Sequence, residues 1–309
     1  VMAKKEERKT ENQDRAAQGK DNHRRLHENS SVDSHPFRRI HHHQLPNLTT
    51  MSYTLLAAAI LPVIILMIFI YCKDKYQKEP IKLLALAFFG GILAIPLDLL
   101  IVEAVNMVYY SETVFYTAFI EAGLCEEFSK FVFLFLFIWR KKDFDEYMDG
   151  IVYATFVSLG FACIENITYV AESGMGTAIG RAILSVPGHF LFGVAMGYFF
   201  GLAKFEKSKR VLFLIMAVLV ATLLHGMYDW LLMVQEHVSD SLGIILYLVF
   251  LGGDILMWKL GLKYIRKHQQ LSQNQAIENE ININPDDTFA NNESDPEYKH
   301  IDWNAGDHS

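Results

Sequence analysis

The sequence has few cysteines and no disulfide framework. Only three occur in 309 residues, Cys72, Cys125 and Cys163, and each lies in or at the edge of an apolar run. Small secreted domains that depend on disulfides are rich in cysteine, so this class is excluded. We expect the three to be small buried residues.

The chain also lacks the basic surplus of a nucleic-acid-binding protein. Its formal net charge is −7. From His268 onward there are nine acidic residues against one Lys, so the rest of the chain is close to neutral. Nothing in this distribution indicates a nucleic-acid partner.

Two polar stretches flank the hydrophobic part of the chain. Residues 1–50 have no apolar periodicity and are predicted to be disordered. Met51 stands directly before the first apolar run, so we expect 1–50 to be an upstream extension rather than functional protein. Residues 268–309 are predicted to form an acidic, disordered cytoplasmic tail, which leaves residues 51–267 as the transmembrane domain.

Long hydrophobic runs fill that domain. Hydrophobic residues make up 51% of the chain and are clustered. Each of seven runs can cross a hydrocarbon core of about 30 Å. The predicted fold class is therefore all-α, a polytopic membrane helical bundle with about seven transmembrane helices. The runs are 52–72, 81–108, 113–139, 150–170, 178–203, 211–234 and 242–264.

Lysine and arginine gather in alternate connecting loops. By the positive-inside rule, this places the N-terminus outside and the C-terminus in the cytoplasm. The opposite loops contain little positive charge beyond Arg181. The basic loops contain Lys73, Lys75, Lys78, Lys82, Arg140, Lys141, Lys142, Lys204, Lys207, Lys209, Arg210, Lys263, Arg266 and Lys267.

Three charged residues lie near the middle of run 113–139. They are Glu126, Glu127 and Lys130. Charges there cost about 2.5–3.5 kcal/mol each, so they are kept when they pair, face a polar cavity or perform chemistry. On a helix Lys130 can pair with either Glu, at spacings of four and three. A structural ion pair explains these three residues as well as a catalytic site does. The polar residues of the other runs distinguish the two interpretations.

The next three runs carry polar residues at compatible depths. At about 1.5 Å per residue they fall within a few helical turns of one another, mostly in the outer half. Singly, each has a structural explanation as a packing histidine or a helix-bridging group. Together, with several glycines that allow close helix approach, they favour one polar cavity. These residues are Glu165 and Asn166, then His189, then His225 and Asp229.

Further acids match no motif and are assigned to helix packing or interfaces. They are Asp98, Glu103 and Asp254.

Peptide-bond hydrolysis is one reaction that this set of residues can perform. It needs a base for water, a proton donor for the amine and oxyanion stabilisation, which Glu and His can supply directly. Alternatively, His189, His225 and one of Glu126 or Glu165 could bind Zn²⁺ and leave an open position. The sequence contains no His-Glu-x-x-His, so the geometry of the familiar soluble zinc proteases is absent.

In order and spacing, these residues resemble the PrsW proteases, within the wider group of CAAX-prenyl endopeptidases and bacteriocin-processing enzymes. The resemblance runs from about residue 73 to residue 229. The motifs that carry it are Asp74-Lys75-Tyr76-Gln77-Lys78-Glu79-Pro80, Glu126-Glu127-x-x-Lys130, Asp149-Gly150, Gly160-Phe161, Glu165-Asn166, His189 and His225-x-x-x-Asp229.

The resemblance implies a multi-pass intramembrane protease of a bacterial cell membrane. Relatives cut a membrane-anchored anti-sigma factor on its outer side and start a stress response. Zinc-dependent and metal-free glutamate catalysis both stay open, and the prenyl-processing relatives carry His where this chain has Glu165. The implied catalytic residues are Glu126, Glu127, His189 and His225; the supporting ones are Lys130, Glu165, Asn166 and Asp229; the candidate metal ligands are His189, His225 and Glu165.

Two other functions use similar residues. A proton-coupled transporter or channel also places Glu, His and Asp inside the membrane, but the chain shows no internal repeat. A haem protein ligated by His189 and His225 lacks any further haem signature. The expected partners are therefore the lipid bilayer and a single-span membrane protein as substrate, an anti-sigma factor being the candidate.

Overall fold

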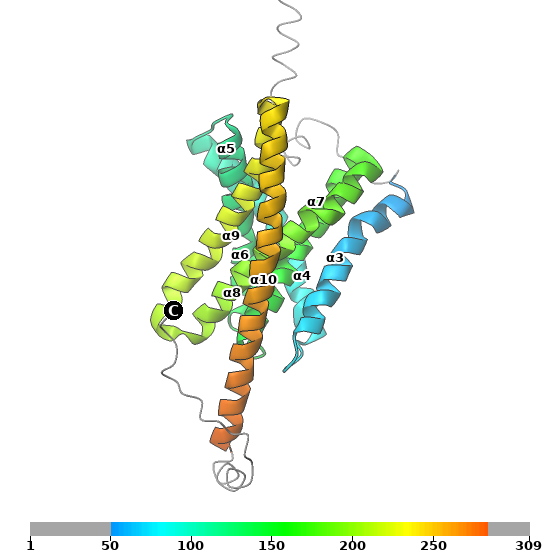
Figure 1. Cartoon of the computed structure of the whole chain (residues 1–309). Helices are drawn as coiled ribbons and strands as arrows, with labels where there is room; N and C mark the ends of the chain where they lie inside the picture. The colour runs from blue at the N-terminus through cyan, green and yellow to red at the C-terminus, as the bar shows by residue number, and fades with distance from the viewer. Residues whose placement is uncertain (1–50, 284–309) are drawn as a thin grey trace, which may run out of the picture. The chain divides into compact units, whose positions relative to one another are not determined.

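The computed structural model describes residues 51–283, and every regular element in this range is a helix (Figure 1). The predicted all-α class is confirmed. Residues 1–50 and 284–309 lie outside the described residues, and with them the predicted extension and most of the predicted tail. In chain order the elements are α3 (Tyr53–Lys73), α4 (Ile81–Val108), α5 (Val114–Tyr116), the π-helix η2 (Thr117–Glu126), α6 (Glu127–Ile138), α7 (Tyr147–Ile183), α8 (Ser185–Phe205), η3 (Lys207–Lys209), α9 (Arg210–Met233), η4 (Val234–His237) and α10 (Asp240–Ile283).

Five helical stretches of the described chain are long and apolar enough to cross a membrane. The prediction was seven. The predicted run 113–139 is helical without interruption from Val114 to Ile138, but its hydrogen bonding changes from α5 to the π-helix η2 and back to α6, so no one α-helix in it reaches membrane length. The fourth and fifth predicted runs belong to one continuous stretch, Tyr147–Phe205. The chain is a multi-pass membrane protein, while the count of seven and the orientation stay predictions.

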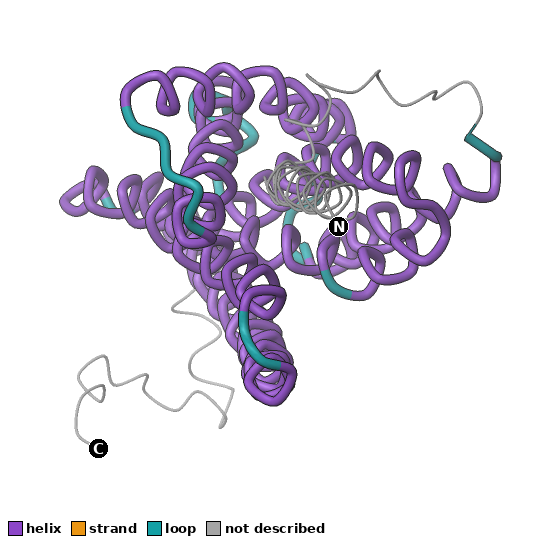
Figure 2. The backbone as a smooth tube through the Cα atoms, turned by 90° about the horizontal axis from the view of Figure 1, so that it is seen from above, coloured by secondary structure: helices purple, strands orange, loops and turns teal. Residues whose placement is uncertain are grey.

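Helices α7 and α8 form the buried centre of the bundle, and α3, α4, α9 and α10 pack around them. Figure 2 shows these helices joined by short loops. Glycine makes the central contact possible: a Cβ at Gly197 would lie 2.4 Å from the carbonyl oxygen of Gly150. The glycines spaced by four along α8 therefore let the backbones of α7 and α8 come into direct contact. The predicted close approach is confirmed at Gly193, Gly197 and Gly201.

The contact between α4 and α7 is equally close at Gly160. A Cβ there would lie 2.0 Å from the carbonyl oxygen of Phe88, which is backbone and cannot rotate away. We expect Gly160→Ala to lower the free energy of unfolding by about 1–3 kcal/mol, as overpacking does. Titration of the purified protein with a denaturing detergent measures this change.

Gly180 provides the matched control on the same helix. A Cβ at Gly180 meets no atom within 4 Å. We expect Gly180→Ala to leave stability unchanged or to raise it by up to about 1 kcal/mol, since Ala favours helix over Gly. Equal losses in both variants would contradict the packing explanation for Gly160.

Helix α10 lies along the outside of the bundle (Figure 1) and makes its polar contacts near its C-terminal end. His268 Nδ1 lies 2.9 Å from the Tyr147 carbonyl oxygen, and Ser272 Oγ accepts a bond of 3.0 Å from the Met148 amide. The tail was predicted to start at His268, yet the helix continues to Ile283. Residues beyond 267 therefore bind the start of α7, a contact that their polar sequence alone does not indicate.

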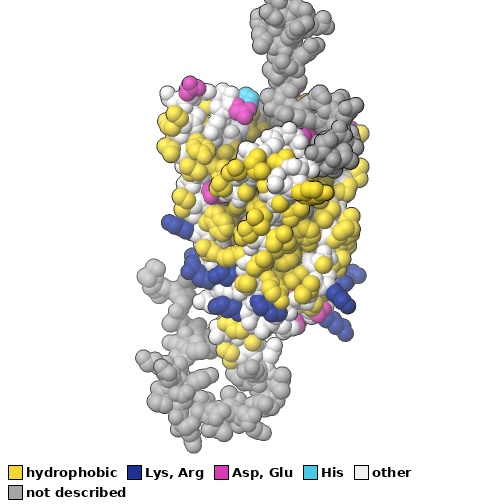
Figure 3. Space-filling view, turned by 90° about the vertical axis from the view of Figure 1, so that its right-hand side faces the viewer, with side chains coloured by type: hydrophobic (Ala, Val, Ile, Leu, Met, Phe, Trp, Pro, Cys, Tyr) yellow, Lys and Arg dark blue, Asp and Glu magenta, His cyan; other side chains and the backbone are white. Residues whose placement is uncertain are grey.

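One end of the bundle collects the basic loops. Lys204 Nζ donates to the Trp139 carbonyl oxygen at 2.8 Å, which joins the ends of α8 and α6, and Gln269 donates to the Lys73 carbonyl oxygen at the end of α3. Figure 3 shows Lys and Arg gathered at this end of a broad hydrophobic surface. The basic loops, which alternate along the sequence, thus lie together at one end of the bundle.

Two of the sequence motifs meet at this basic end in a buried acidic cluster. Glu79 accepts a hydrogen bond from Tyr153, and its backbone amide donates to Asp74 Oδ2 at 3.4 Å. Burial, with Asp149 nearby, raises the pKa of Glu79 to about 11, and burial raises the pKa of Glu146 to about 8. Neutral carboxyls can donate hydrogen bonds as well as accept them. We infer that these motif residues tie the loop between α3 and α4 to the start of α7.

Candidate active site

The two central glutamates lie where η2 meets α6. η2 is a π-helix of ten residues that ends at Glu126, and Glu127 begins α6. The sequence predicted a regular span here; π-helical turns inside helices are frequent at functional sites. A Cβ at Gly123 would lie 2.9 Å from the Thr222 carbonyl oxygen, so η2 and α9 are in close contact. This contact brings the C-terminal half of α9 next to the glutamates.

Lys130 is paired with both glutamates. Its Nζ lies 2.7 Å from Glu127 Oε1 and 3.2 Å from Glu126 Oε2. All three residues are buried, and the side chain of Lys130 has no exposed surface. The ion pair expected from the spacing is confirmed, and its cation serves both acids rather than one.

His225 reaches this pair from α9. Its Nδ1 lies 2.9 Å from Glu127 Oε1 and 4.0 Å from Glu126 Oε2. Its Nε2 lies 3.5 Å from Asp229 Oδ2, one turn further along the helix. Glu127 therefore has two close partners, Lys130 and His225, whereas Glu126 has one.

His189 reaches the same place from α8. Its Nδ1 lies 3.3 Å from Lys130 Nζ, and its Nε2 lies 2.7 Å from Glu165 Oε2 on α7. Ser158 Oγ donates to its carbonyl oxygen at 2.6 Å. The rings of His189 and His225 are 5.2 Å apart between centroids. Four elements distant in sequence thus bring their polar residues together.

Arg181 is the site residue that the sequence analysis missed. It was read as an isolated charge in an outer loop, but its Nη2 lies 2.9 Å from Glu165 Oε2. Its Nε donates to Asn166 Oδ1 at 2.9 Å. The one signal in the sequence is that apolar residues flank Arg181. A charge in such surroundings needs a partner.

A second missed residue is Asp98 on α4, which was assigned to packing. It is fully buried, and neither carboxylate oxygen has a hydrogen-bond partner. Its charge would interact with those of Glu126 and Lys130, although no motif contains Asp98.

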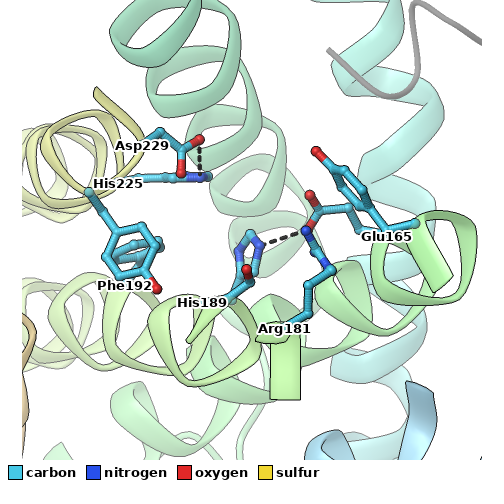
Figure 4. Close-up of a pocket in the computed structure, with 9 residues that line it drawn as sticks. Glu165, Arg181, His189, Phe192, His225 and Asp229 are labelled. Carbon is cyan, nitrogen blue, oxygen red and sulfur yellow. Dashed lines mark hydrogen bonds and ion pairs between the residues drawn. The ribbon is translucent and has the colours of Figure 1, made fainter. Parts of the chain in front are cut away.

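A cavity of about 60 Å³ opens beside the two histidines. Figure 4 shows His189 and Arg181 turned toward Glu165, and His225 between Asp229 and Phe192. The Asp229 side chain is 30% exposed, the most open among these polar groups. The lining residues are Glu165, Tyr169, Arg181, Ser185, His189, Phe192, His225, Tyr228 and Asp229.

The donor set can hold a metal ion. One ligand atom from each of Glu126, Glu127, His189 and His225 lies within 4.8 Å of the others. Carboxylate and imidazole ligands suit Zn²⁺. Glu165, a predicted ligand, is outside this group of four. The Lys130 ammonium contacts three of the four and offsets the negative charge of Glu126 and Glu127.

Fold and site together define the class: a polytopic helical membrane protein with a buried acid–imidazole site, as an intramembrane peptidase requires. The model of the PrsW family, described as intramembrane metalloproteases, matches residues 79–253. The chain belongs to this family and is an intramembrane protease.

Relatives match over nearly their whole length. The Protease PrsW of Geobacillus kaustophilus (strain HTA426) is 36% identical over 227 residues, which cover 73% of this chain and 96% of the relative. That of Clostridioides difficile (strain 630) is 37% identical over 233 residues, 72% and 94% of the two chains. That of Bacillus subtilis (strain 168) is 34% identical over 225 residues, 72% and 100%. No solved structure matches the chain.

Family membership favours proteolysis over the transporter and haem alternatives. Both histidines are bonded to carboxylates, His189 to Glu165 and His225 to Glu127. The same contacts give each imidazole a defined orientation, which suits acid–base work.

Proposed function

We propose that the chain hydrolyses a peptide bond of a membrane-anchored protein with Glu126 as the general base. The observation that carries this proposal is the meeting of Glu126, Glu127, His189 and His225 within 4.8 Å. Glu126 has Lys130 as its one close partner and is the freer of the two carboxylates. It takes a proton from water as the water oxygen attacks the peptide carbonyl carbon.

The other residues hold and complete this arrangement. Glu127, bound by Lys130 and His225, keeps both in place. His225 lies on the cavity wall, and in metal-free catalysis it delivers a proton to the leaving amine as the C–N bond breaks. With a metal bound it would serve as a ligand instead. Asp229, 3.5 Å from its far nitrogen, is placed to restore that proton from solvent.

Zinc is the metal that we propose for the site, with His189, His225 and Glu127 as the ligands that would hold it, so that Glu126 stays the base. Bound there, Zn²⁺ would polarise the peptide carbonyl and lower the pKa of a water molecule. Glu165 faces Arg181 and the far side of His189, so it fits an orienting role better than its predicted role as a ligand.

We expect the purified protein to contain about one zinc per chain, in line with a single catalytic site. Elemental analysis of His225→Ala should show that zinc lost, and chelators should stop cleavage by the unaltered protein. His41, His42 and His43 can also bind metal. The relevant quantity is therefore the difference in zinc content between the unaltered protein and His225→Ala.

His237→Ala, which changes an exposed histidine outside the site, is the control and should keep its zinc. A zinc content near zero in active, chelator-insensitive protein would contradict the metal proposal. It would favour direct catalysis by Glu126 and the histidines.

We also propose that the basic end of the bundle faces the cytoplasm. The gathering of Lys and Arg at that end supports this orientation (Figure 3). His189 is the fifth residue of α8, which ends at the basic face, and His225 is in the second half of α9, which begins there. Both histidines are then nearer the outer surface, from which water has the shorter path.

Cleavage is expected in the outer juxtamembrane segment or the first outer turns of a single-span protein. A transmembrane helix must unwind before attack, and unwinding costs least where freed backbone groups reach water. Protein reconstituted in vesicles with single-span substrates, followed by mass spectrometry of the fragments, locates the cut. A cut at the cytoplasmic end would overturn the orientation or the site.

An anti-sigma factor is the substrate class that we propose, in the cytoplasmic membrane of a bacterium. The support is the family itself and its occurrence in Bacillus-type organisms. Release of an extracytoplasmic domain would then start a stress response. We place the whole catalytic unit in residues 51–267.

A further inference from the structure

Arg181 is a partly buried arginine that the proposed mechanism leaves without a role. Its guanidinium contacts Glu165 and Asn166, both at 2.9 Å, and lies 3.9 Å from the centre of the Tyr169 ring. Its side chain is 12% exposed and lines the cavity. A charge among apolar helices is costly unless it is paired. The contacts of Arg181 therefore indicate which groups it holds in place.

Its partners all precede a break in α7. Glu165 and Arg181 would be about 24 Å apart in a straight helix. Gly174, at φ 79°, interrupts the helical backbone, and the chain turns so that Arg181 meets Glu165. Asn166 Nδ2 also donates to the Ala59 carbonyl oxygen at 2.7 Å, which anchors the group to α3.

The contacts of His189 assign its protons. Its Nδ1 faces the Lys130 ammonium at 3.3 Å, and an ammonium can only donate. Nδ1 is therefore the acceptor, and Nε2 carries the hydrogen that it donates to Glu165 at 2.7 Å. Glu165 Oε2 thus accepts a hydrogen bond from His189 and forms an ion pair with Arg181 Nη2 at 2.9 Å. The Nδ1 lone pair is directed at Lys130, whose ammonium also holds Glu126 and Glu127.

We propose that Arg181 is a positioning residue for proteolysis: it holds the Glu165 carboxylate against His189 Nε2 and so directs His189 Nδ1 at the reaction centre. This inference rests on the proposed function of Glu126 and His189. Without the guanidinium, Glu165 is a carboxylate with no cation at contact distance on its outer side. It then turns to the water of the cavity or becomes neutral, and His189 loses its orientation.

The test is a kinetic comparison in vesicles with one single-span substrate. We expect Arg181→Gln to lower kcat about 10- to 100-fold, the usual loss when an orienting partner is removed, with little change in KM. Arg181→Lys should recover part of kcat, because an ammonium keeps the charge but not the planar fork that spans Glu165 and Asn166. Arg210→Gln is the control, since Arg210 bonds only backbone carbonyls at the basic end and should leave kcat unchanged.

A double variant separates positioning from general destabilisation. If Arg181 acts through Glu165, adding Arg181→Gln to Glu165→Gln should lower kcat no further. Multiplied losses in kcat would overturn the inference, as would full kcat in Arg181→Gln while Glu165→Gln is impaired. Normal cleavage by both Glu165→Gln and Glu126→Gln would instead overturn the proposed function.

The lysine variant keeps the inference testable if Arg181→Gln does not accumulate. Arg181→Lys retains a cation, and its thermal midpoint shows whether the fold is intact. A lowered kcat that disappears in the Glu165→Gln background then supports positioning. Full activity of Arg181→Lys contradicts it, because one ammonium cannot replace both contacts of the fork.

Discussion

Glu126→Gln should lower the rate of cleavage by about 10²- to 10⁴-fold, the range that a general base contributes. The amide keeps the shape of the side chain but cannot accept a proton from water. Glu126 has a single close partner, Lys130 at 3.2 Å, so the amide disturbs the buried charges little. We therefore expect the variant to insert and accumulate normally. The measurement is initial cleavage rate in vesicles together with the amount of membrane-inserted protein.

Glu121→Gln is the matched control for this experiment. Glu121 lies on η2 as well and is buried, but its Oε1 accepts a hydrogen bond from Asn106 at 2.9 Å, away from the histidines. It should cleave at the normal rate. Near-normal cleavage by Glu126→Gln would remove Glu126 from the catalytic role, whereas equal losses in both variants would indicate disruption of η2.

Lys130→Met should be the most destabilising single change in the site. It leaves Glu126 and Glu127 buried without the ammonium that lies 3.2 and 2.7 Å from them. Removing one partner of a buried ion pair costs about 3–5 kcal/mol, because an uncompensated charge remains. The free energy of unfolding in detergent should fall by this amount, and cleavage should be lost.

Two further variants identify the cause of that loss. Lys130→Met combined with Glu127→Gln should recover part of the stability, since one of the two buried charges that lost the ammonium is gone. Lys204→Met, at the basic end, removes a lysine that bonds a carbonyl oxygen and no carboxylate, and should cost much less. A Lys130→Met protein as stable as the unaltered one would contradict the buried charge pairing.

The sequence by itself determined the class of fold. Apolar runs of membrane length can satisfy their backbone hydrogen bonds only as helices, so their presence predicts a helical bundle without tertiary information. Local spacing likewise predicted the pairing of Lys130 with Glu126 and Glu127, because neighbours three and four apart share one side of a helix. The ordered motifs from Asp74 to Asp229 indicated the family.

Only the tertiary structure decided which polar groups meet. Arg181 reads as a loop charge until the chain reverses at Gly174 and brings it 2.9 Å from Glu165. The π-helix within run 113–139 lies where α9 approaches closely at Gly123, a contact that no local pattern records. Periodicity reports the faces of single helices, while contacts such as that of His189 with Lys130 join residues 59 positions apart and depend on how the helices pack.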